Sequence, residues 1–135
     1  VLLKGRIKMK KLFAVVAASA LFLTGCGSSG ATNLGAADFQ AKSAESGVVI
    51  LDVRTGGEFM MGHIENAINI DVEGMTFEGD ISSLDKNATY AVYCQSGRRS
   101  NIAVGKLKDA GFTKLFNLTN GIQDWQAAGL PLVNN

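Results

Sequence analysis

The sequence contains little proline, cysteine and histidine, and each scarcity excludes a class of protein. One proline in 135 residues excludes collagen-like and proline-rich chains. Two cysteines are too few for a disulfide-rich scaffold or a four-cysteine zinc site. Because the chain also has a single histidine, a conventional structural zinc site is hard to build from it.

Charged residues are also scarce, and they are unevenly distributed. They make up 19% of the chain against 47% hydrophobic residues, which argues against disorder along the whole chain. Residues 1–25 hold five basic residues and no acidic one, so the remainder has eight basic against twelve acidic residues. Nucleic-acid binding needs a basic surface, and we therefore expect no nucleic-acid partner.

Residues 1–25 have the pattern of a signal peptide of the lipoprotein type. A basic start at Met9-Lys10-Lys11 precedes the apolar residues 12–23, a run too short to span about 30 Å of hydrocarbon. The following Leu23-Thr24-Gly25-Cys26 resembles the bacterial lipoprotein box, whose cysteine receives lipid and becomes the mature N-terminus. We expect lipidation at Cys26 and an extracytoplasmic or periplasmic location in the bacterial cell envelope. An ordinary cleaved signal or a buried helix is the alternative, and Met9 is a possible true start.

Residues 26–33 predict a flexible tether, and residues 34–135 a single folded domain. A continuous apolar run rich in β-branched residues predicts a buried strand at 48–53, and further strands are predicted at 67–70, 88–93 and 114–118. Helices are predicted at 36–46, 55–61, 100–110 and 120–128, whereas residues 71–87 predict mostly loop. This alternation indicates an α/β domain with a mostly parallel sheet.

Ligands of open α/β sheets bind at the carboxyl ends of strands, which directs attention to the loop after Tyr93. Cys94 begins this loop and a helix follows it, while Ser96 and Gly97 permit a curl of inward-facing N–H groups. Together with Arg98 and Arg99, these groups predict a Cys94 pKa below about 8.5. The alternative is an inert buried cysteine beside two solvated arginines.

The segment Cys94 to Ser100 resembles the active-site loop of the rhodanese family, the thiosulfate sulfurtransferases, and in particular its single-domain periplasmic members with a C-x-x-G-R-x-S loop. Further resemblance spans roughly residues 34–133. It is carried by Ile50 to Arg54, Glu58-Phe59, Gly62-His63-Ile64, Gly111-Phe112, Gly121-Ile122, Trp125 and Ala128 to Pro131. The resemblance implies a rhodanese-like, five-stranded, mostly parallel sheet flanked by helices on both faces.

The resemblance also implies a chemistry. The Cys94 thiolate attacks the outer sulfur of thiosulfate, or of another sulfane-sulfur donor, and carries it as a persulfide to cyanide or a thiol acceptor. Loop amides stabilise the persulfide, and two arginines bind the sulfonate. The expected binding residues are Gln95, Ser96, Gly97, Arg98, Arg99 and Ser100. No metal and no organic cofactor is required.

Other residues receive supporting or structural roles. Asp52 and Arg54 end a buried strand and predict a structural ion pair or a brace behind the loop. His63 is predicted to be structural, because a thiolate of low pKa needs no general base. Asn66 stands where the family often has glycine, which puts the geometry of that turn in question.

Two other functions compete with the sulfurtransferase. Rhodanese-like phosphatases and arsenate reductases use a Cys-x5-Arg loop, but four residues separate Cys94 from Arg99 here. A persulfide carrier or binding module for a protein partner, without turnover on thiosulfate, is the second alternative. The intact Cys94 loop favours the enzyme.

Overall fold

The computed structural model describes residues 30–135, so the predicted signal peptide and Cys26 lie outside the described residues. Its core is a five-stranded sheet in the order β1-β5-β4-β2-β3, and every strand pairing is parallel. The strands are β1 (Ala31–Leu34), β2 (Val48–Asp52), β3 (Ile68–Asn69), β4 (Thr89–Tyr93) and β5 (Leu115–Leu118). The predicted α/β class and five-stranded parallel sheet are confirmed.

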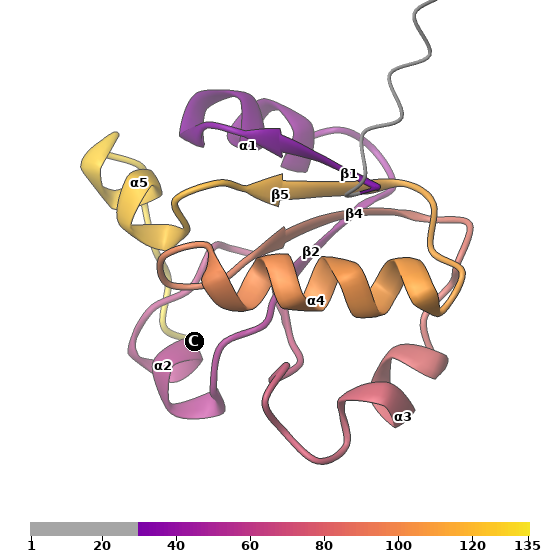
Figure 1. Cartoon of the computed structure of the whole chain (residues 1–135). Helices are drawn as coiled ribbons and strands as arrows, with labels where there is room; N and C mark the ends of the chain where they lie inside the picture. Colours follow the sequence, from indigo (N-terminus) through magenta and orange to yellow (C-terminus); the bar gives the residue numbers. More distant parts are fainter. Residues whose placement is uncertain (1–29) are drawn as a thin grey trace, which may run out of the picture.

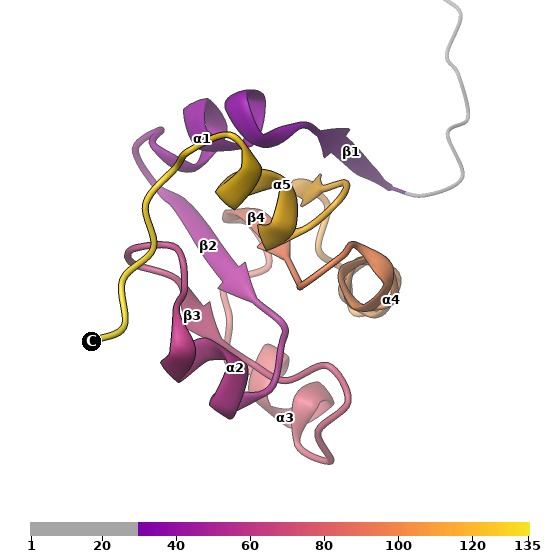
Figure 2. The ribbon, with the colours of Figure 1, turned by 90° about the vertical axis from the view of Figure 1, so that its left-hand side faces the viewer.

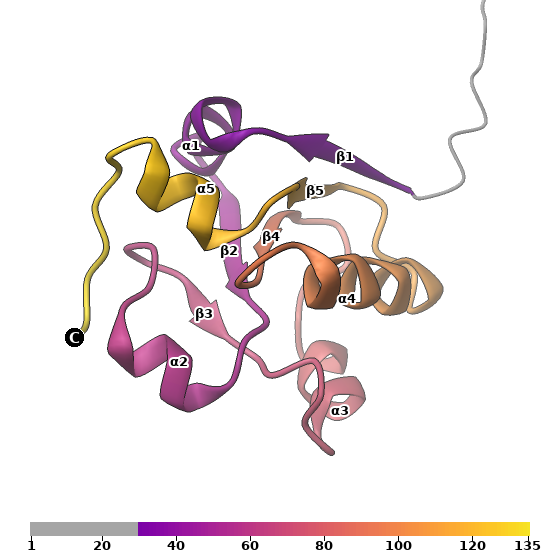
Figure 3. The same cartoon turned by 60° about the vertical axis from the view of Figure 1, so that its left-hand side comes forward.

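Helices cover both faces of this sheet, as Figures 1 and 3 show. One face carries α1 (Ala36–Ser43) and α5 (Ile122–Ala127), and the other carries α3 (Phe77–Ser82) and α4 (Arg98–Asp109). The short helix α2 (Gly56–Met61) lies beyond the end of β2, next to β3 (Figure 2). No helix within residues 30–135 is long and apolar enough to cross a bilayer.

The central strand β4 divides the hydrophobic core in two. Tyr90 and Val92 face the side of α3 and α4, whereas Ala91 and Tyr93 face the side of α1 and α5. All four side chains are buried, as the continuous apolar run of this strand predicts. Phe112 packs in the first core, and Trp125 packs in the second (both buried).

Two elements lie where the sequence predicted none. Strand β1 takes in residues 31–33, which we assigned to the tether, so the folded sheet begins at Ala31. As an edge strand it pairs only with β5 and leaves Thr32 and Asn33 exposed, and it therefore lacks a continuous apolar run. Helix α3 interrupts the predicted loop 71–87 with just two buried anchors one turn apart, Phe77 and Ile81.

The segment after α2 is fixed by the C-terminal tail. The backbone of His63 exchanges two hydrogen bonds of 2.8 Å with Val133. Its buried imidazole stacks on Phe59, with Nδ1 2.8 Å from the Phe59 carbonyl oxygen. These contacts give His63 the structural role that was predicted. Asn66 adopts a positive φ of 67°, a conformation that asparagine tolerates better than most residues, so the turn survives without glycine.

Candidate active site

Cys94 follows β4 directly and begins a tight loop that ends in the first turn of α4. The Cys94 carbonyl oxygen accepts a hydrogen bond of 2.9 Å from the Ile122 amide at the start of α5. The loop is therefore held between the ends of two helices, at the carboxyl edge of the sheet (Figure 3). This is the place at which α/β domains bind ligands.

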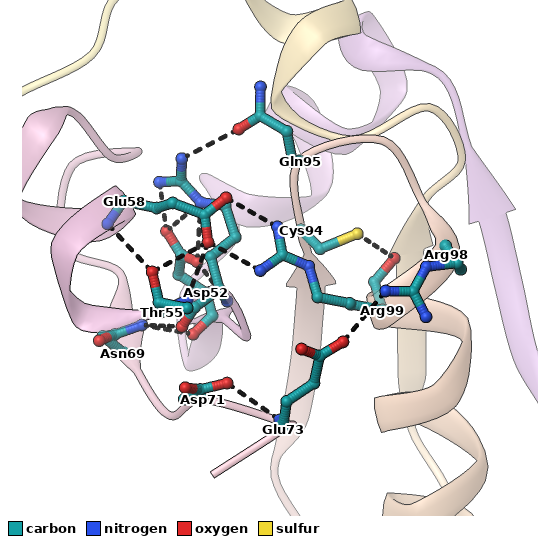
Figure 4. A network of polar contacts seen from close by, with 12 residues as sticks. Asp52, Thr55, Glu58, Asn69, Asp71, Glu73, Cys94, Gln95, Arg98 and Arg99 are labelled. Atoms are coloured by element: carbon teal, nitrogen blue, oxygen red, sulfur yellow. Dashed lines mark hydrogen bonds and ion pairs between the residues drawn. The ribbon is translucent and has the colours of Figure 1, made fainter.

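The sulfur of Cys94 lies inside the curl of the loop. The Gly97 amide donates a hydrogen bond to Sγ at 3.0 Å. The thiol donates to the Ser100 hydroxyl at 3.4 Å, and that hydroxyl donates to the Gly97 carbonyl oxygen at 3.1 Å. Figure 4 shows Sγ turned toward α4 and away from the Gln95 side chain. When the thiol ionises, the Ser100 hydroxyl can turn to donate to the sulfur.

Opposing effects act on the pKa of Cys94, and their balance favours the thiolate. Burial raises the pKa, but hydrogen bonds from the hydroxyl and amide of Ser100 and from the Gly97 and Ser96 amides lower it by more. The N-terminus of α4, with its unpaired N–H groups, lies at the same place. The pKa of Cys94 is therefore lowered, as the sequence predicted.

Two glycines allow the loop to pack this closely. Gly97 has a φ of 105°, and a side chain on it would collide with the Thr119 carbonyl oxygen. Gly121 has a φ of 70°, and a side chain there would collide with the backbone of Gln95 and Ser96. Both positions combine a left-handed backbone with close contact to another chain segment, so each requires glycine.

The two arginines of the loop have different surroundings. Arg99 is mostly buried and donates two hydrogen bonds to Glu58 of α2, at 2.7 and 2.8 Å. Its guanidinium also interacts with the charge of Cys94, and both carboxylate and thiolate raise the Arg99 pKa. Arg98 is 70% exposed and pairs with Glu73 at 3.0 Å. Arg99 is therefore the arginine that faces the site.

Glu58 is held from two sides. Besides Arg99, it accepts hydrogen bonds from the amide and hydroxyl of Thr55 in the capping box that begins α2. The hydrogen bonds from Arg99 lower its pKa most, burial opposes them, and the Thr55 bonds add to the effect, so that the pKa falls to about 2. Glu58 is consequently a fixed negative charge at any physiological pH.

Asp52 and Arg54 form a brace behind the loop. The Arg54 guanidinium donates to Asp52 at 2.7 Å and to the Gly62 carbonyl oxygen at 2.7 Å, and reaches the Gln95 side-chain oxygen at 3.3 Å. Burial opposes the charge of Arg54, but the hydrogen bonds and charge of Asp52 outweigh it and raise the Arg54 pKa. Both side chains are buried. The predicted ion pair is present, and Gln95 serves this brace rather than contacting Sγ.

Comparison with known proteins agrees with this geometry. The family model described as a rhodanese-like domain matches residues 35–128. The chain belongs to the rhodanese-like family. The fold also resembles solved structures: a rhodanese-related protein from Thermoplasma volcanium superposes with a TM-score of 0.68 at 32% identity, covering 77% of this chain and 99% of that one.

Relatives with named activities match about two thirds of this rhodanese-like chain. A sulfurtransferase from Allochromatium vinosum is 33% identical over 86 residues, which cover 64% of this chain and 78% of the relative. The thiosulfate sulfurtransferase GlpE from Ectopseudomonas mendocina is 30% identical over 89 residues, covering 65% and 80% respectively. These matches support a rhodanese-like sulfurtransferase family at modest identity.

The sequence reasoning missed the carboxylates of the rhodanese-like site. Glu58 was noted only as part of a family signature, and Glu73 lay in a segment predicted to be loop. The signal for Glu58 was its place three residues after Thr55, the spacing of a capping box. No such signal marks Glu73, because it contacts Arg98 from 25 residues away in the sequence.

Proposed function

We propose that this chain is a thiosulfate sulfurtransferase that works through a persulfide on Cys94. The observation that carries the proposal is the position of Sγ, which has the Gly97 amide at 3.0 Å and the Ser100 hydroxyl at 3.4 Å. These donors stabilise a thiolate, which is the nucleophilic form of cysteine. The name of the GlpE relative supports thiosulfate as the donor.

The reaction has two steps, and each one transfers a single sulfur atom. In the first, the Cys94 thiolate attacks the outer sulfur of thiosulfate, the sulfur–sulfur bond breaks, and sulfite leaves with the bonding electron pair. In the second, cyanide or a thiolate attacks the outer sulfur of the persulfide, and the Cys94 thiolate leaves. No proton has to be transferred when cyanide is the acceptor.

The same loop is suited to hold the intermediate. A persulfide carries its negative charge on the outer sulfur, one bond further from the backbone than a thiolate. The N–H groups of Ser96, Gly97 and Ser100 surround Sγ and offer donors to that charge.

Intact-mass measurement after treatment with thiosulfate tests the proposal. The wild type is expected to gain one sulfur, about 32 Da, with release of one sulfite, and cyanide should then remove the adduct as thiocyanate. Cys94→Ser should show neither adduct nor sulfite. Unchanged turnover in Cys94→Ser would overturn the mechanism. An adduct that cyanide and small thiols cannot remove would favour the persulfide carrier instead.

We further propose that Cys26 carries a lipid and holds the domain on the outside of the cytoplasmic membrane. The proposal is supported by the basic start, the short apolar run and the Leu23-Thr24-Gly25-Cys26 pattern. Labelling cells with a palmitate analogue should mark the wild type and not Cys26→Ala. Equal labelling of both proteins, or of neither, would refute the anchor.

A further inference from the structure

Both arginines of the Cys94 loop are engaged by carboxylates of the chain itself. Arg99 gives both terminal nitrogens to the two oxygens of Glu58, at 2.7 and 2.8 Å (Figure 4). Arg98 is paired with Glu73. An anionic sulfur donor therefore meets two guanidinium groups that are already paired with carboxylates. The sequence had suggested two cations free to bind the donor.

We propose that Glu58 is a specificity-determining residue, which occupies Arg99 and thereby biases the site toward sulfur donors of low negative charge. The proposal rests on the proposed sulfurtransferase activity and concerns the donor class of the same site. Thiosulfate carries two negative charges, whereas an organic thiosulfonate carries one on its outer sulfur. In the native pairing, the dianion meets a carboxylate beside the loop, and both guanidinium groups of the loop are already paired with carboxylates.

The structure assigns this role to Glu58 more than to Glu73 because of their surroundings. The side chains of Arg99 and Glu58 are 14% and 34% exposed, whereas those of Arg98 and Glu73 are 70% and 54% exposed. Solvent and salt screen the second pair far more. The Arg99 guanidinium also interacts electrostatically with Cys94, so pairing or releasing this guanidinium changes the electrostatic environment of the Cys94 sulfur.

The capping box keeps Glu58 from being displaced easily. The Thr55 amide and hydroxyl donate to the same Glu58 oxygen at 3.1 and 3.0 Å, and the Thr55 hydroxyl accepts from the Glu58 amide at 3.2 Å. A sulfur donor that binds the Arg99 guanidinium must displace Glu58 from it. The Glu58 carboxylate then loses its charged partner and keeps only its hydrogen bonds from Thr55. Replacing Glu58 as the partner of Arg99 therefore weakens the binding of the sulfur donor. The binding is weakened more for a donor that brings two negative charges close to Glu58.

The experiment compares two donors that transfer the same outer sulfur. Methanethiosulfonate is a monoanion, and its attack by the Cys94 thiolate gives the persulfide and methanesulfinate, just as thiosulfate gives the persulfide and sulfite. The measured quantity is the ratio of kcat/KM for thiosulfate to kcat/KM for methanethiosulfonate. In Glu58→Gln this ratio should rise about five- to tenfold, and 0.5 M salt should reduce the rise. Glutamine can serve in a capping box, so α2 should stay folded.

Matched variants separate the role of Glu58 from a general change in charge. Glu65→Gln removes an exposed carboxylate for which no ion pair is found in residues 30–135, and Glu73→Gln frees the exposed Arg98. Both should change the ratio less than twofold. In an Arg99→Gln background, Glu58→Gln should raise the ratio far less than in the wild type, because no guanidinium is released.

The outcomes separate this inference from the proposed function. If both donors form the Cys94 persulfide but Glu58→Gln leaves their ratio within twofold of the wild type, the specificity role is wrong and the sulfurtransferase stands. An equal rise in Glu65→Gln would also overturn it. If neither donor forms a persulfide in any variant, the proposed function itself fails.

Discussion

Cys94 combines burial with a stabilised negative charge. The side chain is almost fully buried, and in apolar surroundings this would leave an inert thiol. Here the hydroxyl of Ser100 and the amides of Ser100, Gly97 and Ser96 outweigh burial and lower the pKa. The reactivity of this residue therefore depends on a few hydrogen bonds within seven residues of chain.

Removal of the Ser100 hydroxyl should weaken the nucleophile. Ser100→Ala is expected to raise the Cys94 pKa, because the largest of the stabilising hydrogen bonds is lost. A hydrogen bond to a charged group contributes about 1.5–3 kcal/mol, so alkylation at neutral pH should slow about tenfold or more. The measurement is the alkylation rate against pH, with the exposed Ser83→Ala as the control. A profile that does not move in Ser100→Ala would contradict this account of the thiol.

At the scale of elements, the site depends on contacts that join α2 and α5 to the Cys94 loop. The ion pair of Glu58 and Arg99 connects α2 with α4, and Gly121 lets the start of α5 lie against the backbone of Gln95. Neither contact is local in sequence. The short helices α2 and α5 are therefore parts of the site and not only cover for the sheet.

Acid should abolish the contribution of the Glu58 ion pair to stability. The Glu58 pKa falls from 4.5 to about 2 on folding, so the pair stabilises fully above pH 4.5 and loses its effect as the pH falls toward 2. With allowance for solvent screening, it contributes about 1–2 kcal/mol. Chemical denaturation should show this gap between the wild type and Glu58→Gln at pH 6 and a closing gap toward pH 2. A gap that is independent of pH would contradict the ion pair as its cause.

Gly121 and Gly129 offer a matched test of close packing. Their φ values are 70° and 76°, but only Gly121 has other atoms where a side chain would lie. Gly129→Ala should cost about 1 kcal/mol from backbone strain alone. Gly121→Ala should cost several kcal/mol and also lower sulfur transfer, because the loop at Gln95 and Ser96 must shift. Thermal unfolding and the thiosulfate assay measure the two effects, and equal losses in both variants would contradict the packing argument.

At the scale of the whole molecule, one buried ion pair connects three distant segments. Arg54 contacts Asp52 at the end of β2, the Gly62 carbonyl oxygen after α2, and Gln95 in the Cys94 loop. The Asn69 side chain donates to the carbonyl oxygens of Asp52 and Arg54 from the end of β3. One guanidinium thus joins the end of β2 to the loop after β4, and Asn69 holds the end of β3 against the same segment.

Loss of that guanidinium should destabilise the whole domain. Arg54→Ala leaves the buried Asp52 carboxylate without its charged partner, which typically costs about 3–5 kcal/mol. Arg98→Ala breaks an exposed pair and should change stability by less than about 1 kcal/mol. Denaturant midpoints for the two variants measure the difference. Similar midpoints for both would show that the buried pair does not hold the domain together.

The sequence by itself determined strands β2 to β5 and the candidate nucleophile Cys94. Strand β4 is buried on both faces, so its run of apolar residues had to be continuous, and the loop from Cys94 to Ser100 carries its donors within one short segment. These features depend on residues close together in the sequence, so they can be predicted from the composition and spacing of a short segment. The short spacing between Cys94 and Gly97, the position of a helix start and the two arginines of the loop together predicted a lowered pKa of Cys94, and the hydrogen bonds of the loop are what lower it.

Only the tertiary structure decided which charges meet at that loop. Arg98 and Arg99 are neighbours in sequence, but the turn of α4 directs one toward solvent and the other toward Glu58, 41 residues away. Strand β1 and helix α3 also escaped prediction, because an edge strand and a helix with two anchors need few apolar residues. The direction of a side chain and its partner far away in the sequence depend on how the helices and strands pack. That packing cannot be predicted from the pattern of residues in one sequence.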